Sequence, residues 1–216
     1  MIKNLIFDFG KVLVDYDFDL FFKKYIPNTE RREKFTPILH NDYVQQLLDW
    51  EAQPLSEIMG NLISQHPEYE HEIRLFSERY TEIITNEIDG MHELLTQLKR
   101  EGFKLYGLSN WCSRVYETIE QFEIFNLLDG YIVSCEEKVI KPEPEIYQRL
   151  FNRFNLNPSE CIFTDDKIEN IEGSKRMGME GIVFQNTTQY KQELRQLLLT
   201  LNAPVWLNNC SLYFPA

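Results

Sequence analysis

Residues able to bind a metal or act on a substrate follow several separate apolar runs in this chain. The first run, LIF, ends at Asp8, and the second residue after this aspartate is Gly10. Later runs are followed by Ser109 and Asn110, by Lys138 and Lys141, and by Asp165 and Asp166, with Asn170 four residues further on. If the runs are parallel strands of one sheet, their carboxyl ends meet at a single edge, where the sites of open sheets form.

Together these residue types can handle a phosphoryl group. Clustered carboxylates bind Mg²⁺, a hard cation that prefers oxygen ligands, and Mg²⁺ together with Lys141 would neutralise phosphate. The hydroxyl of Ser109 and the amides at a helix N-terminus can hold phosphoryl oxygens. A carboxylate such as Asp8, left free to attack in line, would be a covalent nucleophile.

Each residue also has an ordinary structural explanation. Asp8 could cap a turn, Ser109 could cap a helix, and Lys141 could belong to a loop that leads into a helix through the proline after it. The adjacent acids Asp165 and Asp166 are harder to explain, because neighbouring carboxylates repel unless a cation lies between them. The joint placement of these residues therefore favours a functional site.

The elements that must position these residues alternate between strand and helix in the C-terminal part of the chain. Strands are expected at about 103–109, 130–134, 161–166 and 180–184, and helices at about 90–102, 113–122, 142–154, 168–178 and 190–201. Such alternation predicts right-handed crossovers and a parallel sheet covered by helices on both faces. With LIFDF as its first strand, the predicted fold class is α/β, with a Rossmann-like parallel sheet.

Amphipathic stretches separate the first strand from the alternating region. Helices are expected at 17–26, 42–50, 54–66 and 69–84, with Pro27, Pro54 and Pro67 between them, and no strand is expected there. We therefore expect a catalytic core of residues 1–16 and 87–216 and a small helical segment, 17–86, inserted after the first strand. The apolar tail, 202–216, is expected to dock on the core.

Composition and charge limit the classes of partner. The chain has 216 residues, of which 43 % are hydrophobic, as in ordinary globular domains. Its net charge of −12 argues against nucleic acid and anionic membranes as partners. The four cysteines form no CxxC pair, so reduced thiols in the cytoplasm are expected. Neither a signal peptide nor a run near the roughly 20 apolar residues of a membrane helix is recognisable.

The motifs IFDFG, LSN, KPEPEIY and FTDDKIEN resemble, in type and order, those of the haloacid dehalogenase superfamily. The resemblance implies a Mg²⁺-dependent phosphomonoester hydrolase that acts through an aspartyl-phosphate on a small phosphorylated metabolite. It implies Asp8 as the nucleophile, Ser109 beside Asn110 as the group that binds the phosphoryl oxygens, and Lys141 as the bridge between nucleophile and phosphate. The helical segment would be the cap of this superfamily.

The resemblance also implies a metal site. Its protein ligands would be Asp8, the backbone carbonyl of Gly10, and Asp165 and Asp166, with Asp166 the better candidate for a direct ligand. The backbone contact needs no side chain, so glycine at position 10 keeps it.

Gly10 nevertheless departs from the pattern of the superfamily. Most phosphatases of the superfamily carry a second aspartate here, which protonates the leaving group and later activates water. General acid–base help is worth about 10²–10⁴ in rate, so its loss must be offset. Either Asp15, Asp17 or a cap residue such as His40 substitutes, or the leaving group needs less help, as the hemiacetal oxygen of a sugar 1-phosphate does.

The stretches DFGKVLVDYDF and KPEPEIYQ are most similar to bacterial α-D-glucose-1-phosphate phosphatases, which share the glycine. The match weakens at 51–56, where EAQPLS replaces the E-R-G-x-I-S of that group. Aromatic and polar residues such as Tyr43, Gln46 and Trp50 lie in the expected cap helices, and some of them are expected to face the cleft and select the leaving group. Two alternatives stay open: a metal-free 2-haloacid dehalogenase, which also lacks the second acid, and a non-catalytic phosphate-binding protein.

Overall fold

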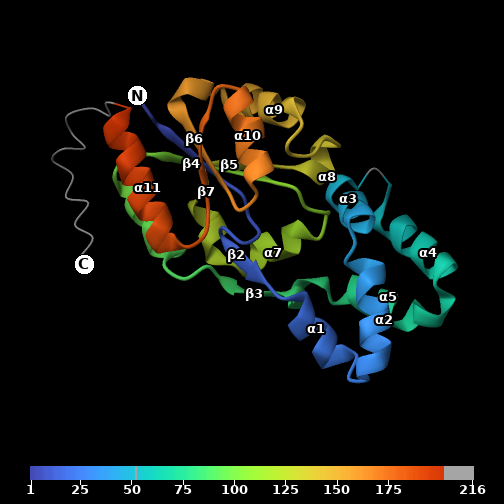
Figure 1. Ribbon diagram of the computed structural model, residues 1–216. Coiled ribbons are helices and arrows are strands. Elements are labelled where there is room, and N and C mark those ends of the chain that lie inside the picture. The colour runs from blue at the N-terminus through green and yellow to red at the C-terminus, as the bar shows by residue number, and fades with distance from the viewer. Residues whose placement is uncertain (52, 202–216) are drawn as a thin grey trace.

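Five parallel strands form the centre of the molecule. The computed structural model describes residues 1–51 and 53–201. The strands lie in the order β5-β4-β1-β6-β7, and every neighbouring pair is parallel (Figure 1). Their bounds are β1 (Asn4–Phe7), β4 (Lys104–Ser109), β5 (Gly130–Val133), β6 (Cys161–Asp165) and β7 (Glu180–Val183). The predicted α/β class with a parallel sheet is confirmed.

Helices cover both faces of this sheet. Successive side chains of a strand point to opposite faces, so Leu5 and Phe7 of β1 belong to one core cluster and Ile6 to another. The first cluster includes side chains of α6 (Met91–Arg100) and α11 (Thr187–Thr200), and the second includes those of α9 (Pro144–Phe154) and α10 (Ile168–Arg176). The shorter helices are α7 (Val115–Gln121), α8 (Ser134–Glu137) and the 3₁₀ turns η3 (Glu123–Leu127) and η4 (Pro158–Glu160).

The register of the sheet aligns the ends of its three middle strands. Phe7, the last residue of β1, pairs with Gly107 of β4 on one side and with Thr164 of β6 on the other. The residues that follow these partners therefore emerge at the same edge, which is where the predicted site residues lie.

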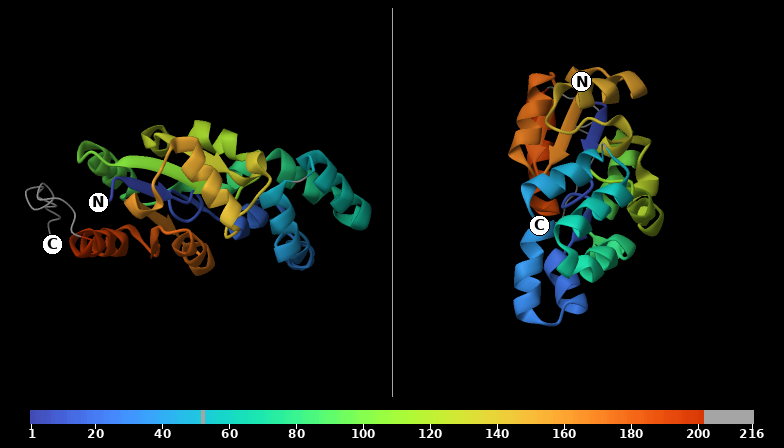
Figure 2. Two further views of the ribbon diagram at one scale, coloured as in Figure 1. Left: turned by 90° about the horizontal axis from the view of Figure 1, so that it is seen from above. Right: turned by 90° about the vertical axis from the view of Figure 1, so that its right-hand side faces the viewer.

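The helices of the inserted segment gather at the end of the molecule opposite α11 (Figure 2). They are α1 (Phe18–Tyr25), α2 (Thr29–Leu39), α3 (Asp42–Trp50), α4 (Leu55–Gln65) and α5 (Glu70–Glu78), with the 3₁₀ turns η1 (Pro67–Tyr69) and η2 (Tyr80–Ile83). Side-chain oxygens of Asp17, Asn28 and Asn41 accept hydrogen bonds from the first turns of α1, α2 and α3. These N-caps satisfy amides that the helices leave free.

A two-stranded antiparallel ribbon joins the helical segment to the sheet. β2 (Val14–Tyr16) pairs with β3 (Ile84–Glu87), with Val14 opposite Glu87 and Tyr16 opposite Ile84. The chain therefore enters and leaves the helical segment through neighbouring strands.

Three sequence-based expectations were wrong in this region. The helix predicted for 69–84 ends at Glu78, and its last residues form η2 and the start of β3. No strand was expected within about residues 17–84, but β3 begins at Ile84, and its partner β2, just before that range, was not predicted. Helix α2 was also missed, because it is weakly amphipathic and contains Pro37, a residue that ordinarily interrupts helices.

Two expectations concern the ends of the chain and its relation to membranes. The predicted docking of the tail, 202–216, lies outside the described residues. Among the residues that the structure describes, no helix combines the length and the apolar character needed to span a bilayer.

Candidate active site

Asp8 lies at the middle of the sheet edge, directly after β1. Its backbone amide donates to the Thr164 carbonyl at 2.9 Å, which extends the strand pairing by one residue. The carboxylate accepts a hydrogen bond from the Phe9 amide at 2.6 Å and another from the Ser109 hydroxyl. Burial raises the pKa of Asp8 to about 7, a shift that Lys141 opposes and Asp165 increases. The Asp8 carboxylate therefore lies at the sheet edge, with its backbone fixed to β6 and the Ser109 side chain of β4 beside it.

Lys141 is buried beneath this edge, and its ammonium group has three acceptors. Its Nζ lies 3.0 Å from Asp8 Oδ1 and 2.7 Å from Asp165 Oδ2, and donates to the Leu108 carbonyl at 2.9 Å. Burial alone would lower the pKa of Lys141, but the carboxylates of Asp165 and Asp8 outweigh it and raise that pKa. The lysine is therefore a fixed positive charge beside Asp8.

The two adjacent aspartates have different surroundings. Asp165 is fully buried and accepts hydrogen bonds from the Lys167 amide at 2.9 Å and from Asn170 Nδ2 at 3.0 Å, in addition to Lys141. Asp166 instead lines the cavity described below, and burial together with Asp165 raises its pKa. Carboxylate oxygens of Asp8, Asp165 and Asp166 lie within 4.8 Å of one another. The hydrogen bonds of Asp165 favour a positioning role, whereas Asp166 is open to a ligand.

Ser109 and Asn110 follow β4 but contact different groups. Ser109 is buried, and its hydroxyl reaches the Asp8 carboxylate. The amide side chain of Asn110 makes a reciprocal pair of hydrogen bonds with the backbone of Lys141, at 2.8 Å and 3.0 Å. Asn110 therefore holds the lysine loop in place, and its predicted role in substrate binding stays a prediction.

Gly10 lies in the turn after Asp8, and its missing side chain leaves room for a tyrosine ring. A Cβ atom built at Gly10 would lie 2.9 Å from Cε1 of Tyr16 and 3.7 Å from Trp111. Tyr16 comes from the ribbon strand β2 and faces the same cavity as Asp8. The aromatic ring thus occupies the space into which a second aspartate would extend.

A cavity of about 330 Å³ lies between the sheet edge and the helical segment. The sheet edge contributes Asp8, Gly10, Ser109, Asn110, Trp111, Lys141, Asp166, Lys167 and Asn170. The ribbon and the helical segment contribute Tyr16, Phe18, His40, Gln45, Asp49, Tyr80, Ile83 and Ile84. A site of this size, lined mainly by polar groups on one side, suits a small charged molecule.

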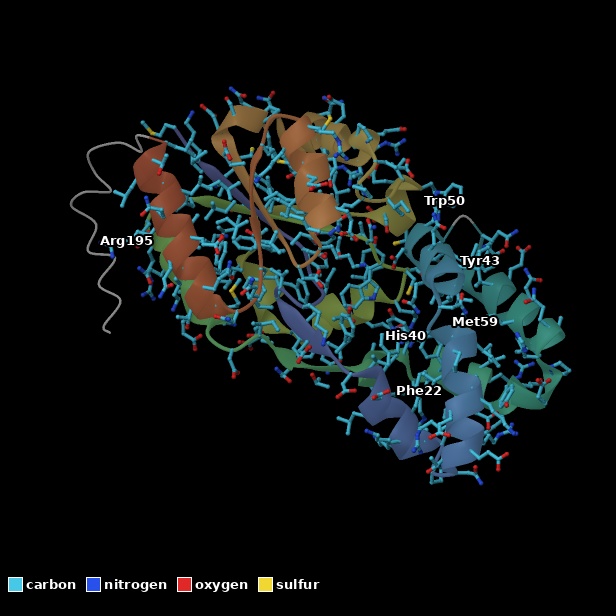
Figure 3. The ribbon with its side chains drawn as sticks, viewed as in Figure 1. Phe22, His40, Tyr43, Trp50, Met59 and Arg195 are labelled. Atoms are coloured by element: carbon cyan, nitrogen blue, oxygen red, sulfur yellow. The ribbon has the colours of Figure 1, made fainter. Side chains whose placement is uncertain are left out.

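The sequence-based prediction of which cap residues face the cavity was partly wrong. His40 lines the cavity, with its ring stacked on Phe18 at 5.2 Å between centroids. Tyr43, Gln46 and Trp50 do not line it; Tyr43 is 69 % exposed, and Trp50 donates from Nε1 to the Lys138 carbonyl (Figure 3).

The opposite face of α3 carries the residues that sequence reasoning missed. Gln45 and Asp49 are four residues apart, so they lie on one face of α3, and both line the cavity. The i, i+4 spacing was visible in the sequence, but nothing in the sequence indicated which face turns toward the sheet. Lys138, which follows the third apolar run, binds the backbone of Glu51 rather than a site residue.

Comparison with curated proteins finds relatives of different length. The chain is 30 % identical over 117 residues to flavin mononucleotide hydrolase 1 of Arabidopsis thaliana, a match covering 54 % of this chain and 48 % of that protein. It therefore spans about half the length of that relative. It is 27 % identical over 213 residues to a D-ribitol-5-phosphate phosphatase of Bacteroides thetaiotaomicron, covering 92 % of this chain and 99 % of that one.

Solved structures share the fold across nearly the whole chain. One is a haloacid dehalogenase-family enzyme of Bacteroides thetaiotaomicron in complex with magnesium and inorganic phosphate (TM-score 0.66, 22 % identity), covering 87 % of this chain and 96 % of that one. Another is the L-2-haloacid dehalogenase of Xanthobacter autotrophicus (TM-score 0.65, 18 % identity), covering 94 % and 88 %. The fold alone thus does not separate phosphatases from dehalogenases.

Most of the chain, including every residue of the candidate site, matches one protein family. Residues 5–184 match the family of haloacid dehalogenase-like hydrolases, a span that begins in β1 and ends after β7. It includes Asp8, Ser109, Lys141 and both aspartates after β6. The sequence-based prediction of superfamily is confirmed: the chain belongs to the haloacid dehalogenase-like hydrolases.

Proposed function

We propose that this protein is a Mg²⁺-dependent phosphomonoester hydrolase that acts through an aspartyl-phosphate on a small phosphorylated metabolite. One observation carries the proposal. Asp166 opens into the cavity beside Asp8, while its neighbour Asp165 is occupied by Lys141 and Asn170. A carboxylate pair beside a nucleophile fits a divalent cation, which a halide as leaving group would not need.

The residues at the sheet edge fit Mg²⁺. Three carboxylates have oxygens within 4.8 Å of one another, and Lys141 sets one positive charge against them, so a divalent cation would relieve the repulsion that remains. We propose Asp8, the Gly10 carbonyl and Asp166 as direct ligands, with Asp165 assisting beside them. When bound, Mg²⁺ neutralises charge on the phosphoryl oxygens. The magnesium and phosphate complex of the Bacteroides thetaiotaomicron enzyme supports this assignment by analogy.

We assign the remaining roles from the contacts of each side chain. A carboxylate oxygen of Asp8 attacks phosphorus in line, which forms the aspartyl-phosphate and releases the alcohol. Lys141, held at 3.0 Å from Asp8, would balance the charge that gathers on nucleophile and phosphate. The Ser109 hydroxyl, already within reach of Asp8, would donate to a phosphoryl oxygen.

The proposed substrate class is a phosphorylated sugar or polyol. The helical segment, residues 17–86, would serve as the cap that selects it, with His40 and Gln45 available for hydroxyl groups. α-D-Glucose 1-phosphate remains a candidate because its hemiacetal oxygen leaves readily. The D-ribitol-5-phosphate phosphatase that matches 92 % of the chain supports the broader class rather than that one ester. The buried thiols of Cys112, Cys135 and Cys161 are free, which fits the expected cytoplasmic location.

The two alternatives make different predictions. A metal-free dehalogenase has support from the fold of the Xanthobacter autotrophicus enzyme, but it leaves the cavity-facing Asp166 without a task. A non-catalytic phosphate-binding protein would need Lys141 and Ser109 but no nucleophile. The Asp8 carboxylate, which lies beside both side chains, argues for turnover.

One experiment tests the proposal against both alternatives. Phosphate release from p-nitrophenyl phosphate, glucose 1-phosphate, glucose 6-phosphate and ribitol 5-phosphate is measured with Mg²⁺ and with EDTA, and chloride release from 2-chloropropionate is measured in parallel. We expect Mg²⁺-dependent phosphate release that Asp8→Asn abolishes, once deamidation has been excluded by mass spectrometry. Chloride release without metal would support the dehalogenase, and phosphate binding without any turnover would support the binding protein.

A further inference from the structure

The cavity contains a carboxylate from the helical segment that the proposed chemistry has not used. Gly10 has no side chain to protonate a leaving group, and the two nearby acids suggested by the sequence have other partners. Asp15 pairs with Lys11, and Asp17 caps α1 by accepting from the Leu20 amide at 2.7 Å. Neither lines the cavity, whereas Asp49 of α3 does.

The C-terminal end of α3 is tied to the sheet edge by several hydrogen bonds. The Asp49 carbonyl accepts from the Ser134 hydroxyl, and Trp50 Nε1 donates to the Lys138 carbonyl at 2.7 Å. Glu51 binds the loop after β4, because its carboxylate accepts from the Ser113 hydroxyl at 2.9 Å. Its carbonyl also accepts from Lys138 Nζ. We call this set of contacts, made by residues 49–51, the latch.

The latch fixes the backbone of Asp49 while leaving its carboxylate available. Among the described residues, no side chain or amide makes a hydrogen bond or ion pair with the Asp49 carboxylate. The groups that face it across the cavity are Lys141 and Lys167 from the sheet edge, Tyr16 from β2 and Tyr80 from η2. Asp8, Asp166 and His40 line the same cavity. An unpaired acid that lines the same cavity as the nucleophile is placed to exchange a proton with a molecule bound there.

We propose that Asp49 is the general acid and base of the reaction, delivered into the cavity by α3 when the latch forms. Asp49 would protonate the leaving group and later activate water, which Gly10 cannot do because it has no side chain. The inference rests on the proposed phosphomonoester hydrolysis. In an in-line displacement the leaving oxygen departs on the side away from the nucleophile, and away from Asp8 is the side of the helical segment.

The two steps balance with one proton carried by Asp49. In the first, an Asp8 oxygen bonds to phosphorus, the bond from phosphorus to the leaving oxygen breaks, and that oxygen takes the proton of the Asp49 carboxyl. In the second, the Asp49 carboxylate takes a proton from water as the water oxygen attacks phosphorus. The bond from phosphorus to Asp8 then breaks. Phosphate leaves, and Asp8 and Asp49 return to their starting forms.

The electrostatics of Asp49 agree with this role. Burial raises its pKa to about 6, although Lys167 and Lys141 both oppose the shift. A carboxyl that titrates near this pH can give a proton in one step and take one in the next. The Tyr16 hydroxyl is a weaker candidate, because burial and the nearby acids raise its pKa far above neutrality. So weak an acid gives its proton to a leaving oxygen less readily than Asp49 does.

The test compares Asp49→Asn with Asp19→Asn, which makes the same change at an exposed position of α1 outside the cavity. In single-turnover experiments with Mg²⁺, Asp49→Asn should slow release of glucose from glucose 6-phosphate by about 10²–10⁴-fold. Release of p-nitrophenol from its phosphate, whose leaving group needs no proton, should change by less than about threefold. Turnover of that ester should then show a burst, because hydrolysis of the aspartyl-phosphate also lacks its base.

The pH profile supplies a second readout. For glucose 6-phosphate, kcat/KM of the natural enzyme and of Asp19→Asn should fall as pH rises through about 6, and Asp49→Asn should lose this fall. Equal losses on both esters, an unchanged pH profile, or leaving-group-dependent losses in Tyr16→Phe instead would overturn the assignment of Asp49. If the natural enzyme releases phosphate from none of the esters, it is the proposed function that fails.

Discussion

Lys141 Nζ lies 2.7 Å from Asp165 Oδ2, and both side chains are almost completely buried. Asp166, the next residue, instead opens into the cavity. Two chemically identical neighbours thus have different surroundings: Asp165 is paired with the lysine, and Asp166 lines the cavity.

The first prediction compares Asp165→Asn with Asp166→Asn. The first variant leaves a buried ammonium group without one of its two counter-charges, so it should lower the free energy of unfolding by about 3 kcal/mol. The second removes repulsion and no hydrogen bond between described side chains, so it should change stability by less than about 0.5 kcal/mol. Denaturant unfolding in EDTA measures both. Equal losses would show that Asp165 does not anchor Lys141.

Mg²⁺ should distinguish Asp166→Asn from the natural protein. A ligand that binds only the folded state raises the unfolding temperature. Thermal unfolding should therefore shift upward with millimolar Mg²⁺ in the natural protein and very little in Asp166→Asn. An equal Mg²⁺ shift in both would remove Asp166 from the metal site.

The second prediction concerns Gly10→Asp. Its Cβ would lie 2.9 Å from the Tyr16 ring, so the variant should lose about 1–3 kcal/mol of stability through overpacking and gain no activity on glucose 6-phosphate. In a double-mutant cycle, Gly10→Asp made in the Tyr16→Ala background should cost much less stability than the same change made in the natural protein. A single variant as stable as the natural protein would mean that the ring moves aside freely.

The third prediction tests the latch through Glu51→Ala. Removal of the carboxylate that binds Ser113 should favour opening of the helical segment and raise KM by about tenfold, which corresponds to about 1.4 kcal/mol. Ser113→Ala should have a smaller effect in the same direction, because its amide remains a donor to Glu51. Steady-state kinetics on one ester suffice. If neither KM nor kcat changes, the contact does not hold the helical segment against the sheet edge.

The fourth prediction concerns pH and the ion pair between α2 and α5. Arg31 donates from Nη2 to Glu72 Oε2 at 2.9 Å, and this contact lowers the pKa of Glu72. A carboxyl with a lowered folded-state pKa adds stability above its unfolded pKa of about 4.5, and this stability is lost as pH falls through the folded value. Arg31→Gln should therefore lower the free energy of unfolding at pH 7 and have a much smaller effect at pH 3.

The exposed pair of Arg74 and Glu70 on α5 provides the control for this measurement. Arg74→Gln removes an i, i+4 ion pair whose side chains are 59 % and 50 % exposed, so it should cost less than about 0.5 kcal/mol. If both arginine variants showed the same pH dependence, general charge effects rather than Glu72 would be responsible.

Most of the sheet and the sheet-edge residues could be predicted from the sequence. Asp8, Ser109 and Asp165 each follow a short apolar run, and parallel strands necessarily bring such positions to one edge. The same argument predicted that Lys141 lies at this edge, but it did not predict that the ammonium group would be buried among three acceptors. Their contacts depend on the register of β1 against β4 and β6, which strand patterns leave open.

The helical segment was less predictable for physical reasons. β2 and β3 have three and four residues, too few for a periodic pattern, and each is stabilised by a partner about 70 positions away in the chain. Gln45 and Asp49 share a face of α3 with the spacing of any helix, so the choice between that face and the one with Tyr43 depends on packing. Contacts of the latch, such as Glu51 with Ser113, join residues 62 apart.

The β2–β3 ribbon has a consequence for how this chain can vary. Because Asp17 donates its amide to the Ile83 carbonyl at 2.9 Å, the two ends of the inserted helices are held one hydrogen bond apart. An insert with adjoining ends can be lengthened, shortened or exchanged without moving a strand of the five-stranded sheet. Cavity residues of the insert can therefore change by exchange at residues 17 and 83, but such a graft must keep an acid at the place of Asp49, which we propose takes part in the reaction.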